Sequence, residues 1–203
     1  MFTLNEKEVK VYSRILYEWF ESSRCSPPAP HFVKLACLLR HSCSRATWVE
    51  TGTYLGQGAS FLSQIASHVH TIEPSDECIS RARNVLQGLD NVTMYKGFSE
   101  DVFPKLLSSL SGSVCFWLDG HFSGGITTKS SLDTPIKFEL REIGRNLNLY
   151  NECVVLIDDI RECGSGDYPP LEYYVFWALK HGLLWTIEHD IFIAKSSSLP
   201  LYP

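Results

Sequence analysis

Glycine and acidic residues whose spacing suits ligand chemistry lie together in the segment 48–60, which reads W-V-E-T-G-T-Y-L-G-Q-G-A-S. The pattern predicts a short apolar strand, a glycine-rich turn and the start of a helix. Glycine is needed where the backbone takes a positive φ or lets a ligand touch main-chain atoms. The free N–H groups at the start of the helix would face an anionic group in that turn. The candidate cofactor-binding residues of the turn are Gly52, Thr53, Tyr54, Gly56 and Gly58.

A second acid follows at a suitable distance, because the apolar run 69–73 reads V-H-T-I-E and ends in Glu73. An acid at the tip of the second strand can accept hydrogen bonds from ribose hydroxyls. The pair of features predicts a pocket for a nucleoside cofactor. The glycine spacing, Gly52-x-x-x-Gly56-x-Gly58, differs from the dinucleotide pattern G-x-G-x-x-G and from a phosphate loop, which carries a lysine after its glycines.

The turn, opened by Glu50, resembles motif I of class I S-adenosylmethionine-dependent methyltransferases. The resemblance implies that the glycine turn cradles the methionine part of the cofactor and that Glu73 binds the ribose. The segment G-F-S-E at 97–100 is similar to the family's adenine-contacting turn, although Phe98 stands where the family often has an aspartate. Beyond the turn itself, the cofactor-binding residues implied by the resemblance are Glu50, Glu73, Pro74, Ser99, Glu100 and Asp119.

Three further aspartates, Asp119, Asp158 and Asp159, follow the fourth and fifth predicted strands. Carboxylates brought together there would repel one another unless they are protonated or bridged by a cation. Oxygen ligands suit a hard ion such as Mg²⁺. The arrangement resembles the metal triad of catechol- and macrocin-type O-methyltransferases, which implies an ion that holds a substrate hydroxyl and lowers its pKa.

Each aspartate also has a simpler interpretation. Asp119 could contact only the cofactor, and Asp159 could cap nearby backbone N–H groups. Adjacent residues of a strand point to opposite faces, so Asp158 and Asp159 reach one ion only if the chain turns at Asp158.

His121 is the candidate general base, because an imidazole titrates near neutral pH. A hydrogen-bonded structural histidine is the alternative for this residue. Asp119 is the second candidate catalytic residue. Segment 122–131, with two glycines and many hydroxyls, predicts a loop beside the reaction centre. Arg161 and Tyr168, in the loop after the acidic pair, are candidate substrate contacts.

The elements that must position these residues alternate along the chain. Strands are expected at 46–50, 69–73, 91–95, 114–119 and 153–158, with helices at 57–67, 76–88, 99–110 and 135–149 between them. A helix at 170–181 and strands at 183–188 and 191–195 follow, and the two-residue link predicts a hairpin. The prediction is an α/β, Rossmann-like, doubly wound sheet of seven mainly parallel strands that ends in an antiparallel hairpin. Residues 1–45, with helices at 5–22 and 31–42, form an N-terminal helical extension to a methyltransferase domain at 46–203.

Composition restricts the class of protein. The 203 residues carry a net charge of −5, which argues against a nucleic-acid partner. No apolar run is long enough to span a bilayer, and the polar N-terminus does not read as a secretory signal. The seven cysteines form no C-x-x-C pair, so we expect reduced thiols in a cytoplasmic protein.

The sequence therefore predicts a Mg²⁺-assisted O-methyltransferase that uses S-adenosylmethionine and acts on a hydroxyl of a small molecule, such as a sugar or a glycosylated or phenolic metabolite. Two alternatives stay open: a catalytically silent S-adenosylmethionine-binding or scaffold protein, and an NAD-dependent sugar-modifying enzyme. The aromatic residues at 173–177 make a homodimer an additional expectation.

Overall fold

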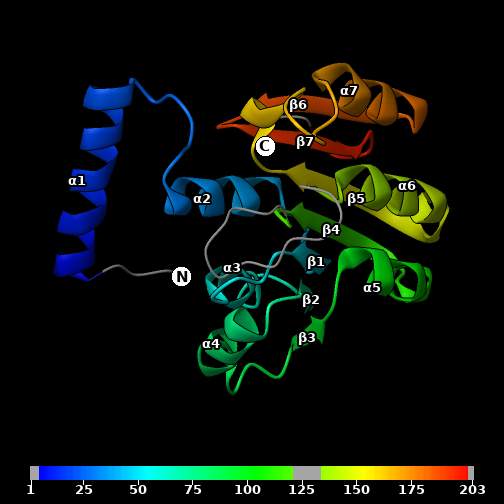
Figure 1. Ribbon diagram of the computed structural model, residues 1–203, viewed down its shortest axis with the longest axis horizontal. Coiled ribbons are helices and arrows are strands. Elements are labelled where there is room, and N and C mark those ends of the chain that lie inside the picture. The colour runs from blue at the N-terminus through cyan, green and yellow to red at the C-terminus, as the bar shows by residue number, and fades with distance from the viewer. Residues whose placement is uncertain (1–4, 121–133, 201–203) are drawn as a thin grey trace.

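A computed structural model describes residues 5–120 and 134–200 of the chain. Within these ranges the strands form one seven-stranded sheet of order β3-β2-β1-β4-β5-β7-β6, in which only β7 runs antiparallel to its neighbours (Figure 1). The strands are β1 (Thr47–Thr51), β2 (His68–Glu73), β3 (Val92–Lys96), β4 (Gly112–Leu118), β5 (Tyr150–Ile157), β6 (Leu183–Glu188) and β7 (Ile191–Ser196). The predicted architecture, including the terminal hairpin, is confirmed.

Helices cover both faces of the sheet (Figure 1). They are α1 (Glu6–Ser23), α2 (His31–His41), α3 (Gln57–Leu62), α4 (Asp76–Leu86), α5 (Ser99–Leu106), α6 (Ile136–Asn146) and α7 (Leu171–Lys180). Helix α3 is shorter than the predicted 57–67, and the predicted helix 99–110 ends as a 3-10 turn, Leu107–Ser109. The strands preceding the glycine turn and the acidic residues end within one residue of the predicted positions.

Two hydrophobic layers hold the helices to the sheet. Along β1 the layers alternate by residue: Val49 packs in the layer under α5, α6 and α7, whereas Trp48 packs in the layer under α2 and α3. Both side chains are fully buried. Because side chains alternate between the faces of a strand, a strand buried at nearly every position, as β1 is, must be covered on both sides. The central strands are therefore rigid supports for the polar residues at their tips.

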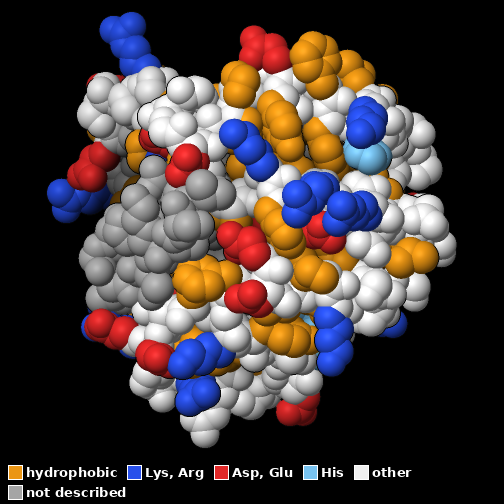
Figure 2. All heavy atoms as spheres, turned by 45° about the vertical axis from the view of Figure 1, so that its right-hand side comes forward, with side chains coloured by type: hydrophobic (Ala, Val, Ile, Leu, Met, Phe, Trp, Pro, Cys, Tyr) orange, Lys and Arg blue, Asp and Glu red, His pale blue; other side chains and the backbone are white. Residues whose placement is uncertain are grey.

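Helix α7 carries the aromatic residues on which the expectation of a dimer was based. Tyr174 and Trp177 point into the protein, and Trp177 Nε1 donates a hydrogen bond to the Leu140 carbonyl at 2.8 Å. Phe176 and Leu179 remain exposed, at 67% and 58%. Figure 2 shows hydrophobic side chains along the top of one face, at the height of α7. Most of the aromatic stretch is thus core, with a smaller exposed part.

The two helices of the N-terminal extension differ in how they are packed. Helix α1 is capped at its N-terminus by a capping box between Asn5 and Glu8, and none of its residues is buried. Helix α2 buries Cys37 and Leu38 completely in the layer that contains Trp48. Helix α2 is therefore part of the packed core, while α1 lies at the margin of the molecule (Figure 1).

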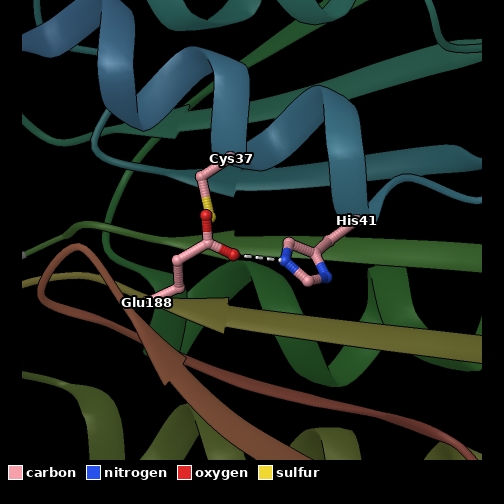
Figure 3. A group of neighbouring side chains, drawn as sticks. All are labelled: Cys37, His41 and Glu188. Carbon is pink, nitrogen blue, oxygen red and sulfur yellow. Dashed lines mark hydrogen bonds and ion pairs between the residues drawn. The ribbon is translucent and has the colours of Figure 1, made fainter. Parts of the chain in front are cut away.

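The C-terminal end of α2 is tied to the tip of β6 (Figure 3). His41 Nε2 lies 2.9 Å from Glu188 Oε2, and Arg40 pairs with Glu188 Oε1. Burial, together with the charges of Lys195 and Arg40, lowers the pKa of His41 to about 4, so the ring is neutral and donates this bond. Donor atoms of Cys37, His41 and Glu188 lie within 4.8 Å of one another, as in a metal site. Arg40 and Lys195 lie nearby as cations, and both Glu188 oxygens are already paired. These features indicate a set of polar contacts between Arg40, His41 and Glu188, here called the clasp, and not a metal centre.

None of the helices within the described ranges is both long enough and apolar enough to cross a membrane.

Glu188→Gln is expected to loosen the clasp between α2 and β6, because an amide cannot accept charge-assisted bonds from both Arg40 and His41. The free energy of unfolding should fall by about 1–2 kcal/mol, measured by denaturant titration. Glu77→Gln is the matched control, since its ion pair with Arg81 is exposed at 51% and 56%. Equal losses of stability in the two variants would contradict the role given to the clasp.

Candidate functional site

The glycine turn that follows β1 is shaped by two close contacts. Gly52 has φ +86°, and a Cβ there would lie 2.4 Å from the carbonyl oxygen of Asp119 at the end of β4. A Cβ on Gly58 would lie 2.2 Å from Glu50 Oε1. Gly56, with φ +87°, is the N-cap residue of α3. The turn therefore lies directly against the tips of β1 and β4, where only glycine fits.

Glu50 lies in β1 beneath this turn and is almost fully buried. Its Oε2 accepts a hydrogen bond from the Thr71 hydroxyl at 2.6 Å, and that hydroxyl lies 2.5 Å from the Thr53 hydroxyl. Burial, followed by the negative charges of Asp119 and Glu73, raises the pKa of Glu50 to about 8. The carboxyl group is thus held in its protonated form at neutral pH in the protein without ligand.

Glu73, at the tip of β2, holds the glycine turn from the other side. Its Oε2 accepts a hydrogen bond from the Tyr54 N–H at 2.8 Å, and its Oε1 accepts one from the Ser75 N–H at 2.9 Å. Burial is the main cause of a raised pKa. Each carboxylate oxygen has a second lone pair, so the group can still accept a bond from a ligand hydroxyl. Pro74 lies in the connection between these contacts and is half-buried.

The predicted adenine turn contains Ser99, which begins α5 and is buried. Its hydroxyl donates a hydrogen bond of 3.3 Å to Glu100 Oε2. On the adjacent α6, Glu139 is buried, and Oε1 has no hydrogen-bond partner among the described residues. Burial raises the pKa of Glu139 to about 7, against the lowering effect of the hydroxyls of Ser99 and Thr51.

Glu139 was not identified from the sequence, although a signal is present there. It falls three residues after Ile136 and four before Ile143, on the buried face of α6. An acid on the apolar face of an amphipathic helix indicates a buried carboxyl group.

The structure brings Asp119, Asp158 and Asp159 together, with carboxylate oxygens within 4.8 Å of one another. The N–H of Asp119 donates to the Thr51 carbonyl and that of Asp158 to the Leu118 carbonyl, so the strand ladder fixes both tips. Asp159 has φ +58°, so the chain turns immediately after Asp158. The turn required for both adjacent aspartates to face one point is present.

The chemistry of these donors fits a hard divalent cation. All three are oxygen ligands, and Asp158 Oδ1 is buried without a hydrogen-bond partner among the described residues. Burial, followed by the charge of Asp119, raises the pKa of Asp158 to about 7. A cation placed among the three carboxylates would lower that pKa and use the unpaired oxygen.

Two basic side chains that contact the cluster change its charge. Lys34, from α2, bonds to Asp158 Oδ2 and lies 3.6 Å from Asp159 Oδ1. Arg161 Nη1 lies 2.6 Å from Asp159 Oδ1 and also pairs with Asp190. Burial alone would lower the pKa of Lys34, but the neighbouring carboxylates outweigh it and the pKa is raised. Arg161, a candidate substrate contact, also pairs with the acidic turn.

Lys34 is the second residue that sequence reasoning missed. The sequence predicts only that Lys34 belongs to a helix of the N-terminal extension, and nothing in its local pattern distinguishes it from a solvent-exposed lysine. The pairing spans 124 positions, so only the tertiary fold reveals it.

A pocket opens at the tips of β4 and β5. It is lined by Leu118, Asp119, Gly120, Thr134, Ile136, Glu139, Ile157, Asp158, Tyr168 and Tyr174. Tyr168, a candidate substrate contact, is thus on its wall. His121 and the predicted loop after it fall in 121–133, outside the described residues. The glycine turn lies against the tip of β4, and the pocket begins on the other side of that tip. Both are therefore next to the point between β1 and β4 where the strand order reverses and α/β proteins bind ligands.

Comparison with known proteins gives similarity in structure only. No protein-family model matches the chain, and no curated protein matches it in sequence. Among solved structures, a proposed O-methyltransferase from Klebsiella pneumoniae is similar with a TM-score of 0.57 and 16% identity, over 97% of this chain and 91% of that one. Aeropyrum pernix fibrillarin, with natively bound S-adenosyl-L-methionine, is similar with a TM-score of 0.51 and 14% identity, over 80% and 73%.

A precorrin-6y C5,15-methyltransferase from Geobacter metallireducens is similar with a TM-score of 0.50 and 14% identity, over 81% of this chain and 86% of that one. All three are less than 25% identical to this chain, so the similarity concerns the fold. The chain therefore has the Rossmann-like fold of the class I S-adenosylmethionine-dependent methyltransferases.

Proposed function

We propose that the protein is an S-adenosylmethionine-dependent, Mg²⁺-assisted O-methyltransferase that acts on a hydroxyl of a small molecule, such as a sugar or a glycosylated or phenolic metabolite. The observation that carries the proposal is the concentration of buried carboxyl groups around the glycine turn, at the ligand-binding edge of a methyltransferase fold. Fold alone does not identify a reaction, so the argument rests on the chemistry of this edge.

The electrostatics of the edge favour a cationic cofactor. Charges that shift the pKa of Glu50 come from Asp119 and Glu73, and both are negative. S-adenosylmethionine brings a sulfonium and an ammonium group, which would be attracted to these carboxylates. The diphosphate of NAD would be repelled by the same groups, and the glycine spacing also differs from a dinucleotide turn.

Methyl transfer is an in-line displacement in which the C–S bond breaks as the C–O bond forms. Asp119, Asp158 and Asp159 would hold the Mg²⁺ ion, which when bound supplies Lewis-acid polarisation of the acceptor hydroxyl. His121 is the residue that we propose would accept the hydroxyl proton, and the products would be the methylated acceptor and S-adenosylhomocysteine. Alignment of the two reactants is the main contribution of the protein to this reaction.

A catalytically silent cofactor-binding or scaffold protein is the second candidate. The observation that favours it is the pairing of Lys34 with Asp158 and of Arg161 with Asp159, because such ion pairs can serve the stability of the fold alone. This candidate predicts binding of S-adenosylmethionine without turnover.

A cytoplasmic location and a homodimer are also proposed. All seven cysteines are free thiols, as in a reducing compartment.

Exposed apolar side chains on α1, including Leu16 at 42% and Phe20 at 60%, provide a surface for a second copy of the chain. Light scattering after size exclusion would show a dimer in solution, and Phe20→Glu would reduce it to a monomer.

The first test is calorimetric titration of the protein with S-adenosylmethionine, with NAD as the control ligand. Saturable binding of the first and none of the second is expected. Gly58→Ala should weaken this binding by about tenfold or more, because the added Cβ displaces Glu50 from beneath the turn. Gly88→Asn is the control, since Gly88 has open space around it and asparagine tolerates its positive φ. Absence of binding to the unsubstituted protein would exclude the proposed cofactor.

Binding of the cofactor is expected to depend on pH. With a pKa of about 8, Glu50 is protonated below that pH in the free protein, and a bound cation favours its ionised form. Binding should therefore release a proton, and affinity should rise with pH by up to about tenfold per unit, levelling off above pH 8. Calorimetry in buffers of different ionisation enthalpy measures the released proton. Glu50→Gln should show a flatter pH profile, and an unchanged profile would contradict the role of Glu50.

Asp158→Asn is expected to reduce Mg²⁺-stimulated methyl transfer by about a hundredfold or more, because the amide supplies one less charged ligand for the ion. Binding of S-adenosylmethionine should persist. Transfer of a labelled methyl group to a panel of hydroxyl acceptors measures turnover, with Asp101→Asn, an exposed residue of α5, as the control. Full Mg²⁺-stimulated turnover by Asp158→Asn would remove the metal from the proposal.

A further inference from the structure

Lys34 pairs with two of the three carboxylates that would hold a bound cation, Asp158 and Asp159. We propose that the Lys34 ammonium and a divalent metal ion compete for the same carboxylates, so that metal binding expels the Lys34 side chain toward solvent. This inference rests on the proposed function in one respect, the binding of a divalent ion by Asp119, Asp158 and Asp159.

The contacts of Lys34 place its charge within the cluster. Its Nζ bonds to Asp158 Oδ2 and lies 3.6 Å from Asp159 Oδ1. The side chains of Asp158 and Asp159 are 1% and 5% exposed, so little water screens the interaction. An ion bound to both aspartates would lie within a few ångströms of the ammonium, where repulsion between like charges is strong.

The ligand needs of a small divalent ion also oppose the present arrangement. Mg²⁺ demands nearly octahedral oxygen geometry at about 2.0–2.1 Å. Asp158 Oδ1 has no hydrogen-bond partner among the described residues, whereas its Oδ2 is held by Lys34. Expulsion of Lys34 frees that second oxygen and removes a positive charge from the ligand sphere.

The anchoring of α2 determines what moves. Its C-terminal half is fixed by the clasp to Glu188 and by the buried side chains of Cys37 and Leu38. Lys34 lies one turn closer to the N-terminus and is 15% exposed, so its four-carbon side chain has a route to solvent. The exchange is therefore a side-chain movement, with the helix itself held in place.

The test is calorimetric titration of Mg²⁺ into the full chain and into three variants. Lys34→Met keeps the length and removes the charge, and it should bind Mg²⁺ about tenfold or more tightly than the unsubstituted protein. Lys34→Arg keeps the charge and should bind about as weakly as the unsubstituted protein. Lys10→Met, on exposed α1, removes a lysine far from the cluster and should leave affinity unchanged.

The outcomes separate this inference from the proposed function. Measurable Mg²⁺ binding with equal affinity in Lys34→Met and the unsubstituted protein overturns the competition but leaves the metal site. No Mg²⁺ binding by any of the proteins overturns both the competition and the metal assistance. Binding of S-adenosylmethionine, measured in parallel, tests the cofactor independently.

A second measurement needs no variant, so it remains decisive if Lys34→Met fails to fold. Lysines of the unsubstituted protein are labelled by reductive methylation with and without Mg²⁺, and the sites are quantified by mass spectrometry. Expulsion predicts a several-fold increase in Lys34 labelling with Mg²⁺, while Lys10 stays constant as the internal reference. Unchanged Lys34 labelling at saturating Mg²⁺ would show that the side chain is not expelled.

Discussion

Burial of carboxyl groups at one edge of the sheet is the constraint on which the rest of the site depends. The apolar strands that carry Glu50, Asp119 and Asp158 need helices on both faces, and those helices remove water from the strand tips. Removal of water disfavours the charged form of each acid, so the pKa values of Glu50 and Asp158 rise to about 8 and about 7. Such groups gain most from a neighbouring positive charge.

The protein supplies part of that charge from its own chain. Lys34 and Arg161 contact the acidic cluster, whereas no basic side chain has a hydrogen bond or ion pair with Glu50 among those described. Basic side chains therefore compensate the negative charge of the acidic cluster, whereas none compensates the carboxyl group of Glu50. A cationic cofactor suits the region around Glu50, beneath the glycine turn. A divalent ion suits the acidic cluster if the Lys34 side chain is displaced.

Local patterns were sufficient to predict the sheet, its order of strands and helices, and the acids at its tips. The strands that end at Thr51, Glu73 and Ile157 lie within one residue of their predicted ends, because apolar runs bounded by polar residues must be buried. Lys34 could not be predicted in this way, since its partner is 124 residues distant and its role depends on how α2 packs. The ionisation of Glu50 was also beyond sequence reasoning, because it depends on exclusion of water by the assembled fold.

The close packing around Gly52 and Gly58 has a consequence for how the motif evolves. A side chain at either position collides with the chain itself, with the carbonyl of Asp119 or the carboxyl of Glu50, before any ligand is considered. Selection for a folded protein alone would therefore retain Gly52, where the collision is with the backbone, even in a descendant that had lost its cofactor, whereas a side chain at Gly58 would displace the Glu50 carboxyl group. The glycine motif therefore reflects the close packing of two strand tips. Loss of the activity would show instead as substitutions of the acids around it.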